Sequence, residues 1–220
     1  MINCTKFTVI LFVIAIISGC SQKYIDINAT LKEALYGGEN VIFDKDEIET
    51  LPYASMKVRI NDGPYILMVL AFADSTPNSD TIALKWMSAD GAMIIMEHGR
   101  IIKTLNLYGE NLVDVSIETA KENPNSASSH FTAIYDWQPD YTFNQVVSVT
   151  SEPQNTALTS SLIWEKELTL VHESLTFSNR DIDVDNYYWL DADKNVLKSS
   201  QWLIPNKLHI EYEILKPYQI

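Results

Sequence analysis

The sequence offers few residues whose types and spacing could carry out catalysis or bind a metal. It contains no Gly-x-Ser-x-Gly elbow, no glycine-rich phosphate loop and no His-Glu-x-x-His motif. The four histidines are scattered over the chain, at His98, His130, His172 and His209. A metal site needs several convergent donors, and no two of these histidines have metal-ligand spacing. We therefore expect no catalytic residue, no metal ligand and no cofactor.

An acidic run near the C-terminus suggests calcium, but it fails the test of spacing. Asp181, Asp183 and Asp185 alternate in the way that the first ligands of an EF-hand loop do. That loop needs glycine at its sixth position and glutamate at its twelfth. Here these positions hold Asn186 and Ala192. Solvated turn residues are the better interpretation.

The residues best suited to contact a sugar are aromatic. Tyr187, Tyr188 and Trp189 are consecutive and, with Trp202, form the densest aromatic group of the chain. On a strand, Tyr187 and Trp189 share one face while Tyr188 takes the other. A pair on the exposed face could stack on sugar rings. The alternative is that these rings fill a core, as most strand aromatics do.

Two cations are also candidates for contact with a glycan or a protein partner. Arg100 and Lys103 stand out in an acidic protein and could meet an acidic glycan. They are three residues apart, so on a regular strand they would point to opposite faces. Ordinary solvated strand charges are therefore the alternative interpretation.

The N-terminus resembles a bacterial lipoprotein export signal. Lys6 precedes an apolar run over residues 7–17, and small residues lead to Gly19-Cys20. The run is about half of the roughly 20 residues that span a bilayer, so a cleaved signal is favoured over a permanent anchor. The lipobox-like ending implies cleavage between Gly19 and Cys20, with diacylglycerol and an amide-linked acyl chain such as palmitate on Cys20. Ser21, where an aspartate would favour inner-membrane retention, favours the outer membrane.

Composition limits the partners and the redox chemistry of the protein. The chain has 220 residues and a net charge of −13. Loss of residues 1–19 would remove Lys6 and no acid, leaving 201 residues and a charge of −14. So acidic a surface repels nucleic acid, which is not an expected partner. Only Cys4 and Cys20 are present, so a mature domain has no disulfide.

The pattern of elements indicates a mainly β protein with one or two short helices near its start. Asn28–Tyr36 could be helical, and Asp44 with Glu47 resembles a capping box before a second helix. From Met56 the hydrophobic period is two, and tight-turn signals recur. We expect a signal at 1–19, a lipidated tether with short helices at 20–50, and an antiparallel β-barrel or sandwich-like domain at 51–220. The strands are expected at 56–60, 65–73, 81–88, 92–98, 99–115 with a break at 109–111, 131–137, 141–150, 157–166, 167–177, 187–190, 196–204 and the C-terminal segment around 209–214.

Several segments resemble the YjbF-type, or group 4 capsule, lipoproteins. They are Leu51-Pro52-Tyr53-Ala54-Ser55, His98-Gly99-Arg100 with Lys103-Thr104, and Tyr188-Trp189-Leu190-Asp191. The likeness extends in register over the mature chain. It departs at residues 105–109, where a glycine usually comes sooner, and at 193–195, where the turn usually has one.

The resemblance implies a β-rich, barrel-like domain that serves capsule or exopolysaccharide assembly and export. We expect a non-enzymatic accessory, lipid-anchored to the outer membrane, on its periplasmic face, that contacts the export machinery or the polysaccharide. A glycan-modifying enzyme is one alternative, because the 29 acidic residues leave a carboxylate pair open. A pure glycan-binding module and a general envelope-structure lipoprotein are the others.

Overall fold

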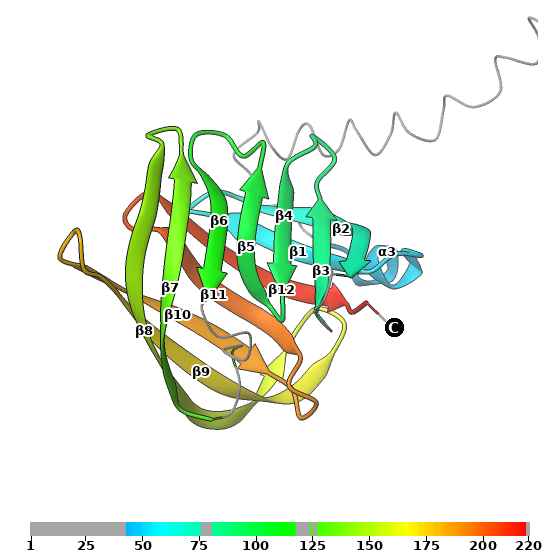
Figure 1. Ribbon diagram of the computed structural model, residues 1–220. Coiled ribbons are helices and arrows are strands. Elements are labelled where there is room, and N and C mark those ends of the chain that lie inside the picture. The colour runs from blue at the N-terminus through cyan, green and yellow to red at the C-terminus, as the bar shows by residue number, and fades with distance from the viewer. Residues whose placement is uncertain (1–42, 76–80, 118–123, 125–126, 219–220) are drawn as a thin grey trace, which may run out of the picture.

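The protein folds into a single antiparallel sheet that curls into a nearly closed barrel (Figure 1). The structure is a computed structural model that describes residues 43–75, 81–117, 124 and 127–218. The expected signal, Cys20, the tether and the first expected helix lie outside the described residues. No helix among the described residues has the length and apolar character needed to cross a membrane.

The described part begins with one helix, α3 (Lys45–Thr50). Asp44 is its N-cap, and the carboxylate accepts hydrogen bonds from the backbone N–H groups of Asp46 (2.8 Å) and Glu47 (3.1 Å). This is how an N-cap satisfies the unpaired donors of the first turn. Only Ile48 of this helix is buried. The helix expected after Asp44 is therefore present.

Twelve strands follow. Each pairs with the next in sequence, except that β5 does not pair with β6, and β1 also pairs with β12. Their bounds are β1 Ser55–Ile60, β2 Tyr65–Ser75, β3 Ile82–Met87, β4 Met93–Glu97, β5 Arg100–Leu105, β6 Asn111–Ile117, β7 Ser129–Gln138, β8 Thr142–Ser160, β9 Glu165–Phe177, β10 Ile182–Leu190, β11 Val196–Ile204 and β12 Leu208–Lys216. The mainly β, antiparallel, barrel-like class expected from the sequence is thus confirmed.

The sheet begins at β5 and ends at β6, and these two edges are neighbours at a seam. In Figure 1 the two strands stand side by side at the front, with β1, β12, β11 and β10 behind them. Side chains link them here. The Leu112 N–H donates to Thr104 Oγ1 (2.9 Å), and the Leu107 N–H donates to Asn111 Oδ1 (3.1 Å). These contacts satisfy backbone donors that a strand edge would otherwise leave unpaired.

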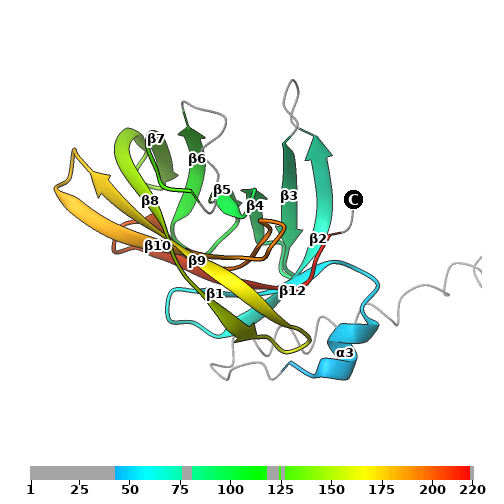
Figure 2. The same cartoon turned by 90° about the horizontal axis from the view of Figure 1, so that it is seen from below.

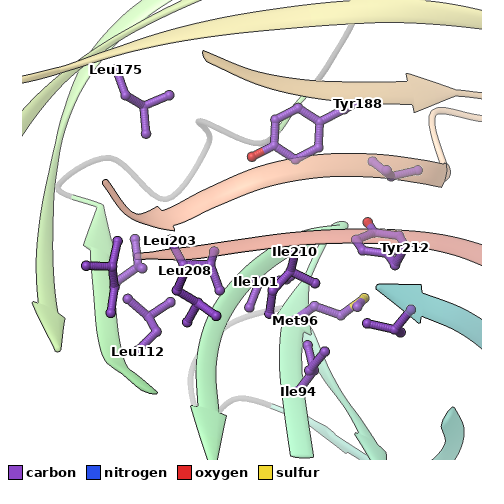
Figure 3. Close-up of a cluster of buried hydrophobic side chains, with 14 of the residues drawn as sticks. Ile94, Met96, Ile101, Leu112, Leu175, Tyr188, Leu203, Leu208, Ile210 and Tyr212 are labelled. Carbon is purple, nitrogen blue, oxygen red and sulfur yellow. The ribbon is translucent and has the colours of Figure 1, made fainter. Parts of the chain in front are cut away.

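The core is the interior of this barrel. Alternate residues of each strand point inward, as the two-residue period requires. Figure 3 shows Ile94, Met96, Ile101, Leu112 and other side chains meeting there from strands far apart in sequence. Seen from below, α3 lies outside the sheet (Figure 2).

Some expected strand boundaries are wrong: β10 begins at Ile182 and not at 187, and the boundaries expected between 150 and 166 also differ. The segment Glu152–Asn155 contains Pro153 and was expected to be a turn, but β8 runs through it to Ser160. Pairing with β7 ends at Ser151, and beyond it β8 pairs with β9 alone, with a register shift after Pro153. A proline lacks the N–H of a ladder but is tolerated at an unpaired edge or a bulge. The real turn is at 161–164.

Candidate functional site

The outward face of β10 carries the aromatic pair that the sequence singled out. Tyr188 points into the barrel and is fully buried, while Tyr187 and Trp189 lie on the outer face, partly exposed. The two outer rings are neighbours, with centroids 6.4 Å apart. The imidazole of His172 on β9 stacks on Tyr187, with centroids 5.1 Å apart and planes inclined by 18°.

Antiparallel register extends this pair into two rows of side chains across the sheet. In one row, Trp189 on β10 is opposite Lys198 on β11, which is opposite Glu213 on β12, which is opposite Lys57 on β1. The parallel row contains, in order, Tyr187, Ser200, Glu211, Arg59 and Tyr65. Side chains opposite one another on one face lie close enough to interact.

These two rows line a groove of about 360 Å³ on the outside of the barrel, which we call the outer groove. It combines four aromatic residues, three cations, two carboxylates and two serines. Its lining consists of Lys57, Arg59, Tyr65, Tyr187, Trp189, Lys198, Ser199, Ser200, Glu211, Tyr212 and Glu213. Aromatic faces beside hydrogen-bonding groups suit a sugar ring, which has apolar faces and a polar edge.

Two of the three cations in the outer groove are held by carboxylates. Lys57 Nζ lies 3.0 Å from Glu213 Oε2, and Arg59 NH2 lies 2.6 Å from Glu211 Oε2. Burial lowers the pKa of Arg59, but the hydrogen bond and charge of Glu211 outweigh it, so the net direction is upward. The Arg59 guanidinium also lies over the Tyr65 ring, 5.0 Å from its centroid. Two ion pairs therefore hold the charged side chains of the groove in place.

A serine and a histidine lie beside the outer groove at hydrogen-bond distance. Ser200 Oγ is 2.8 Å from His209 Nε2, and the His209 ring packs against Trp202. Burial lowers the pKa of His209, which favours the neutral imidazole that can accept from the hydroxyl. Nucleophilic catalysis also needs a group that orients the base and donors for an oxyanion. Among the described residues, no carboxylate is bonded to the second ring nitrogen.

Arg100 lies inside the barrel and not at its surface. Its side chain is 4% exposed and forms a two-pronged ion pair with Glu173, with NH1–Oε2 and NH2–Oε1 distances of 2.8 and 2.7 Å. It also donates to the Tyr188 hydroxyl at 3.1 Å. Burial opposes the charge, but Glu173 outweighs this and raises the pKa of Arg100. Arg100 therefore cannot contact a ligand at the surface, because its side chain is buried and paired with Glu173.

The other predicted residues are dispersed. Lys103 is partly exposed on β5, which β4, β3 and β2 separate from β1, so it is far across the sheet from the outer groove. Asp185 on β10 pairs with His172 at 2.7 Å. In the part of the chain that the structure describes, no three His, Cys, Asp or Glu side chains are grouped to hold a metal. The structure thus brings together Tyr187 and Trp189 but neither cation.

Sequence reasoning missed the cationic and carboxylate half of the outer groove. The outward positions of Glu211 and Glu213 follow from the alternation of the last strand. That β1 and β12 are neighbours, so that Lys57 and Arg59 face those glutamates, is a long-range pairing with no local signal.

A second hollow, of about 700 Å³, lies where β12 ends. It is lined mainly by apolar and aromatic side chains, among them Tyr53, Trp164 and Pro217. Lys216, which also lines it, donates to the carbonyl oxygens of Glu49 and Leu51. The other cation in its lining, Lys166, lies 3.8 Å from Asp191 Oδ2. Both cations of this hollow thus have partners within the chain, so the outer groove is the better candidate for recognition of a polar ligand.

Comparison with known proteins gives one consistent result. The family model described as "Group 4 capsule polysaccharide lipoprotein gfcB, YjbF" matches residues 28–215. The "Uncharacterized lipoprotein YjbF" of Escherichia coli K12 is 25% identical, over 96% of this chain and 98% of the relative. The "Uncharacterized lipoprotein GfcB" of the same strain is 26% identical, over 91% and 94%. The crystal structure of the E. coli lipoprotein YmcC matches 91% of this chain and 98% of its own, with a TM-score of 0.70 and 24% identity, and shares the fold.

Proposed function

Because the chain belongs to the YjbF family of group 4 capsule polysaccharide lipoproteins, we propose that it is a non-enzymatic accessory of capsule or exopolysaccharide assembly and export that contacts the polysaccharide through its outer groove. The observation that carries this proposal is the aromatic pair Tyr187 and Trp189, which stands partly exposed beside a row of charged and hydroxyl groups. A sugar ring can stack on an aromatic surface of this kind, which faces outward and is partly exposed. The export machinery is the expected second partner.

The anchor forms part of the proposal. Cys20 receives diacylglycerol on its sulfur, the chain is cleaved between Gly19 and Cys20, and the new amine is acylated. The protein then lies on the periplasmic face of the outer membrane. Each buried methylene contributes about 0.8 kcal/mol, so two or three acyl chains hold the protein firmly. Confinement to the membrane raises the effective concentration near envelope partners, so weak contacts with a passing polymer suffice.

The geometry favours binding over the glycan-modifying alternative. Ser200 and His209 are the nearest approach to a nucleophile and a base near the outer groove. Ser200 lies on β11 between β10 and β12, and its row is a paired antiparallel ladder. Backbone N–H groups within such ladders are used by neighbouring strands and do not form an oxyanion hole. This supports a structural role for the Ser200–His209 pair.

The proposal is tested in a strain that lacks the gene, by measuring surface-bound and released polysaccharide. The wild-type gene should restore the polymer. Cys20→Ala and the double variant Tyr187→Ala/Trp189→Ala should not, although immunoblots should show comparable protein. Tyr108→Ala removes a fully exposed ring from the turn before β6, outside the outer groove, and should restore the polymer like wild type.

Three outcomes would decide against the proposal. An unchanged amount of polymer in the deletion strain, grown where the wild type makes it, would remove the link to polysaccharide. Failure of His209→Gln to restore polymer at normal protein level would favour the enzyme, because a general base would have been lost. Surface defects in strains that make no polysaccharide would favour a general envelope role.

A further inference from the structure

The outer groove has a local charge opposite to that of the whole protein. The chain carries a net charge of −13, yet the groove has three cations and two carboxylates. Both carboxylates are engaged, Glu211 by Arg59 and Glu213 by Lys57 and the Ser161 hydroxyl. The surplus positive charge therefore belongs to the remaining cation.

That cation is Lys198. No described carboxylate lies within ion-pair distance of its ammonium group, which lies over the Trp189 ring, 5.2 Å from the centroid. A lysine held against an indole keeps its three donors directed to solvent and to any ligand beside the ring. An unpaired cation is thus fixed at the border of the surface proposed to stack on a sugar.

The neighbouring charges restrict where a negative group could bind. A sugar carboxylate near Glu211 or Glu213 would meet repulsion from these side chains, whereas near Lys198 it would meet attraction. Discrimination by a repulsive element next to an attractive one is a general source of specificity. The other acidic residues of the protein weaken the attraction to Lys198 only a little, because charges separated by more than about 8 Å are screened at physiological salt.

We propose that the polysaccharide segment bound in the outer groove contains an acidic sugar of the uronic-acid class, and that Lys198 recognises its ring carboxylate. This inference rests on the proposed function, since it names the ligand class of the same site. A uronic-acid carboxylate is attached directly to the pyranose ring. A sugar ring bound beside Trp189 therefore carries its charge at its edge, and the Lys198 ammonium group that lies over the indole is the cation next to it.

The test compares two forms of one polymer. The extracellular polysaccharide of the producing strain is purified, and half of it is carboxyl-reduced so that uronic acids become neutral sugars. Binding of each form to the full-length protein in detergent micelles is measured by calorimetry at low and at high salt. We expect the native form to bind roughly fivefold more tightly at low salt, the size of one exposed ion pair, and the difference to shrink at high salt.

Matched variants assign the effect to one residue. Lys198→Met should remove the preference for the acidic form and keep binding of the neutral one, while Lys198→Arg should keep the preference. Lys103→Met removes the same charge from β5, outside the groove, and should behave like wild type.

The outcomes separate the two proposals. Equal binding of both forms, a native polymer without uronic acid, or equal effects of Lys198→Met and Lys103→Met would overturn the acidic-sugar inference and leave glycan contact intact. Failure of the wild-type protein to bind either form would overturn glycan contact itself.

Discussion

Arg100 shows how one residue organises the interior of the barrel. Its guanidinium joins β5 to Glu173 on β9 and to Tyr188 on β10, and the whole group is buried. Gln201 on β11 adds to this network by accepting from the Ile101 N–H at 3.1 Å. A charge is buried only where it is paired and hydrogen-bonded. The network therefore ties one edge strand of the sheet to the opposite wall.

We predict that Arg100→Met destabilises the protein by about 3–5 kcal/mol, because Glu173 is left as an unpaired buried charge. The double variant Arg100→Met/Glu173→Leu should recover much of this loss, since it removes both charges. The free energy of unfolding is measured by urea titration followed through tryptophan fluorescence. Lys103→Met, which removes a partly exposed cation of the same strand, should change it by less than about 0.5 kcal/mol. If Arg100→Met lowered the free energy of unfolding as little as Lys103→Met does, Glu173 would have to be hydrated in the variant.

Some placements at this scale could be predicted from sequence and others could not. The two-residue period placed Tyr188 on one face and Tyr187 with Trp189 on the other, as observed. The period left open which face was the interior. The partner of Arg100 is 73 residues away, and no local pattern points to it.

At the scale of elements, the turn between β4 and β5 requires glycine. Gly99 has φ +84°, and a Cβ on it would lie 2.4 Å from Cβ of Val196. Its carbonyl oxygen accepts from the Tyr212 hydroxyl (2.6 Å) and from Gln201 Nε2 (3.0 Å). The turn backbone is thus pressed against β11 and β12 and sets the position of Arg100. The Gly-Arg sequence that marks the family resemblance has a structural role.

Gly99→Ala should therefore destabilise the protein more than Gly91→Ala does. Gly91 also has positive φ, +86°, but a Cβ there would have no neighbour within 4 Å. Gly91→Ala should cost about 1–3 kcal/mol from backbone strain alone, and Gly99→Ala should cost more because the contact with Val196 adds to it. Thermal unfolding of both variants measures the difference. Equal melting temperatures would mean that Val196 moves aside freely.

Strand boundaries could be predicted at tight turns. They could not be predicted where a strand continues past the end of its neighbour in the sheet. The Asn61–Pro64 and Ala89–Gly91 turns lie where Asn-Asp-Gly and Asp-Gly signals predicted them. The extension of β8 through Pro153 could not be predicted, because it depends on β7 ending at Ser151. The tolerance of a proline is then a property of the sheet and not of the local sequence.

For the whole molecule, three buried tyrosines make stability depend on alkaline pH. Burial raises the pKa of Tyr135 to about 12, and it also raises the pKa values of Tyr188 and Tyr212. The unfolded chain releases these protons near pH 10. The folded state therefore holds more protons above pH 10, and stability must fall as pH rises from there through the folded-state values.

We expect the free energy of unfolding to change little between pH 8 and 9.5 and to fall steeply above pH 10. The slope is about 1.4 kcal/mol per pH unit for each tyrosine that stays protonated only when folded. Tyr135→Phe should reduce this slope, while Tyr108→Phe, which removes an exposed hydroxyl, should leave it unchanged. Urea titrations at pH 8, 9.5, 10.5 and 11 measure it. A constant free energy up to pH 11 would contradict the burial of these hydroxyls.

The outer groove forms only when strands from both ends of the chain come together in the sheet. Its two rows draw residues from β1, β2, β10, β11 and β12, from Lys57 to Glu213. Of its lining, alternation and the aromatic cluster predicted Tyr187 and Trp189 as candidate contacts. The rest depends on β1 lying beside β12, which a sequence of consecutive hairpins does not reveal.

The pairing of β1 with β12 also determines where the two ends of the barrel chain lie. Ser55 is opposite Lys216, and the Lys216 ammonium group donates to the carbonyl oxygen of Glu49 in the last turn of α3. The polypeptide therefore enters and leaves the barrel at adjacent points. A reporter or affinity tag added after β12 would project beside the segment that leads back to Cys20. For labelling that leaves this end clear, the turn after Ile204 at the opposite end of the last two strands is the better insertion point, and a circular permutant opened there would keep every neighbouring pair of strands.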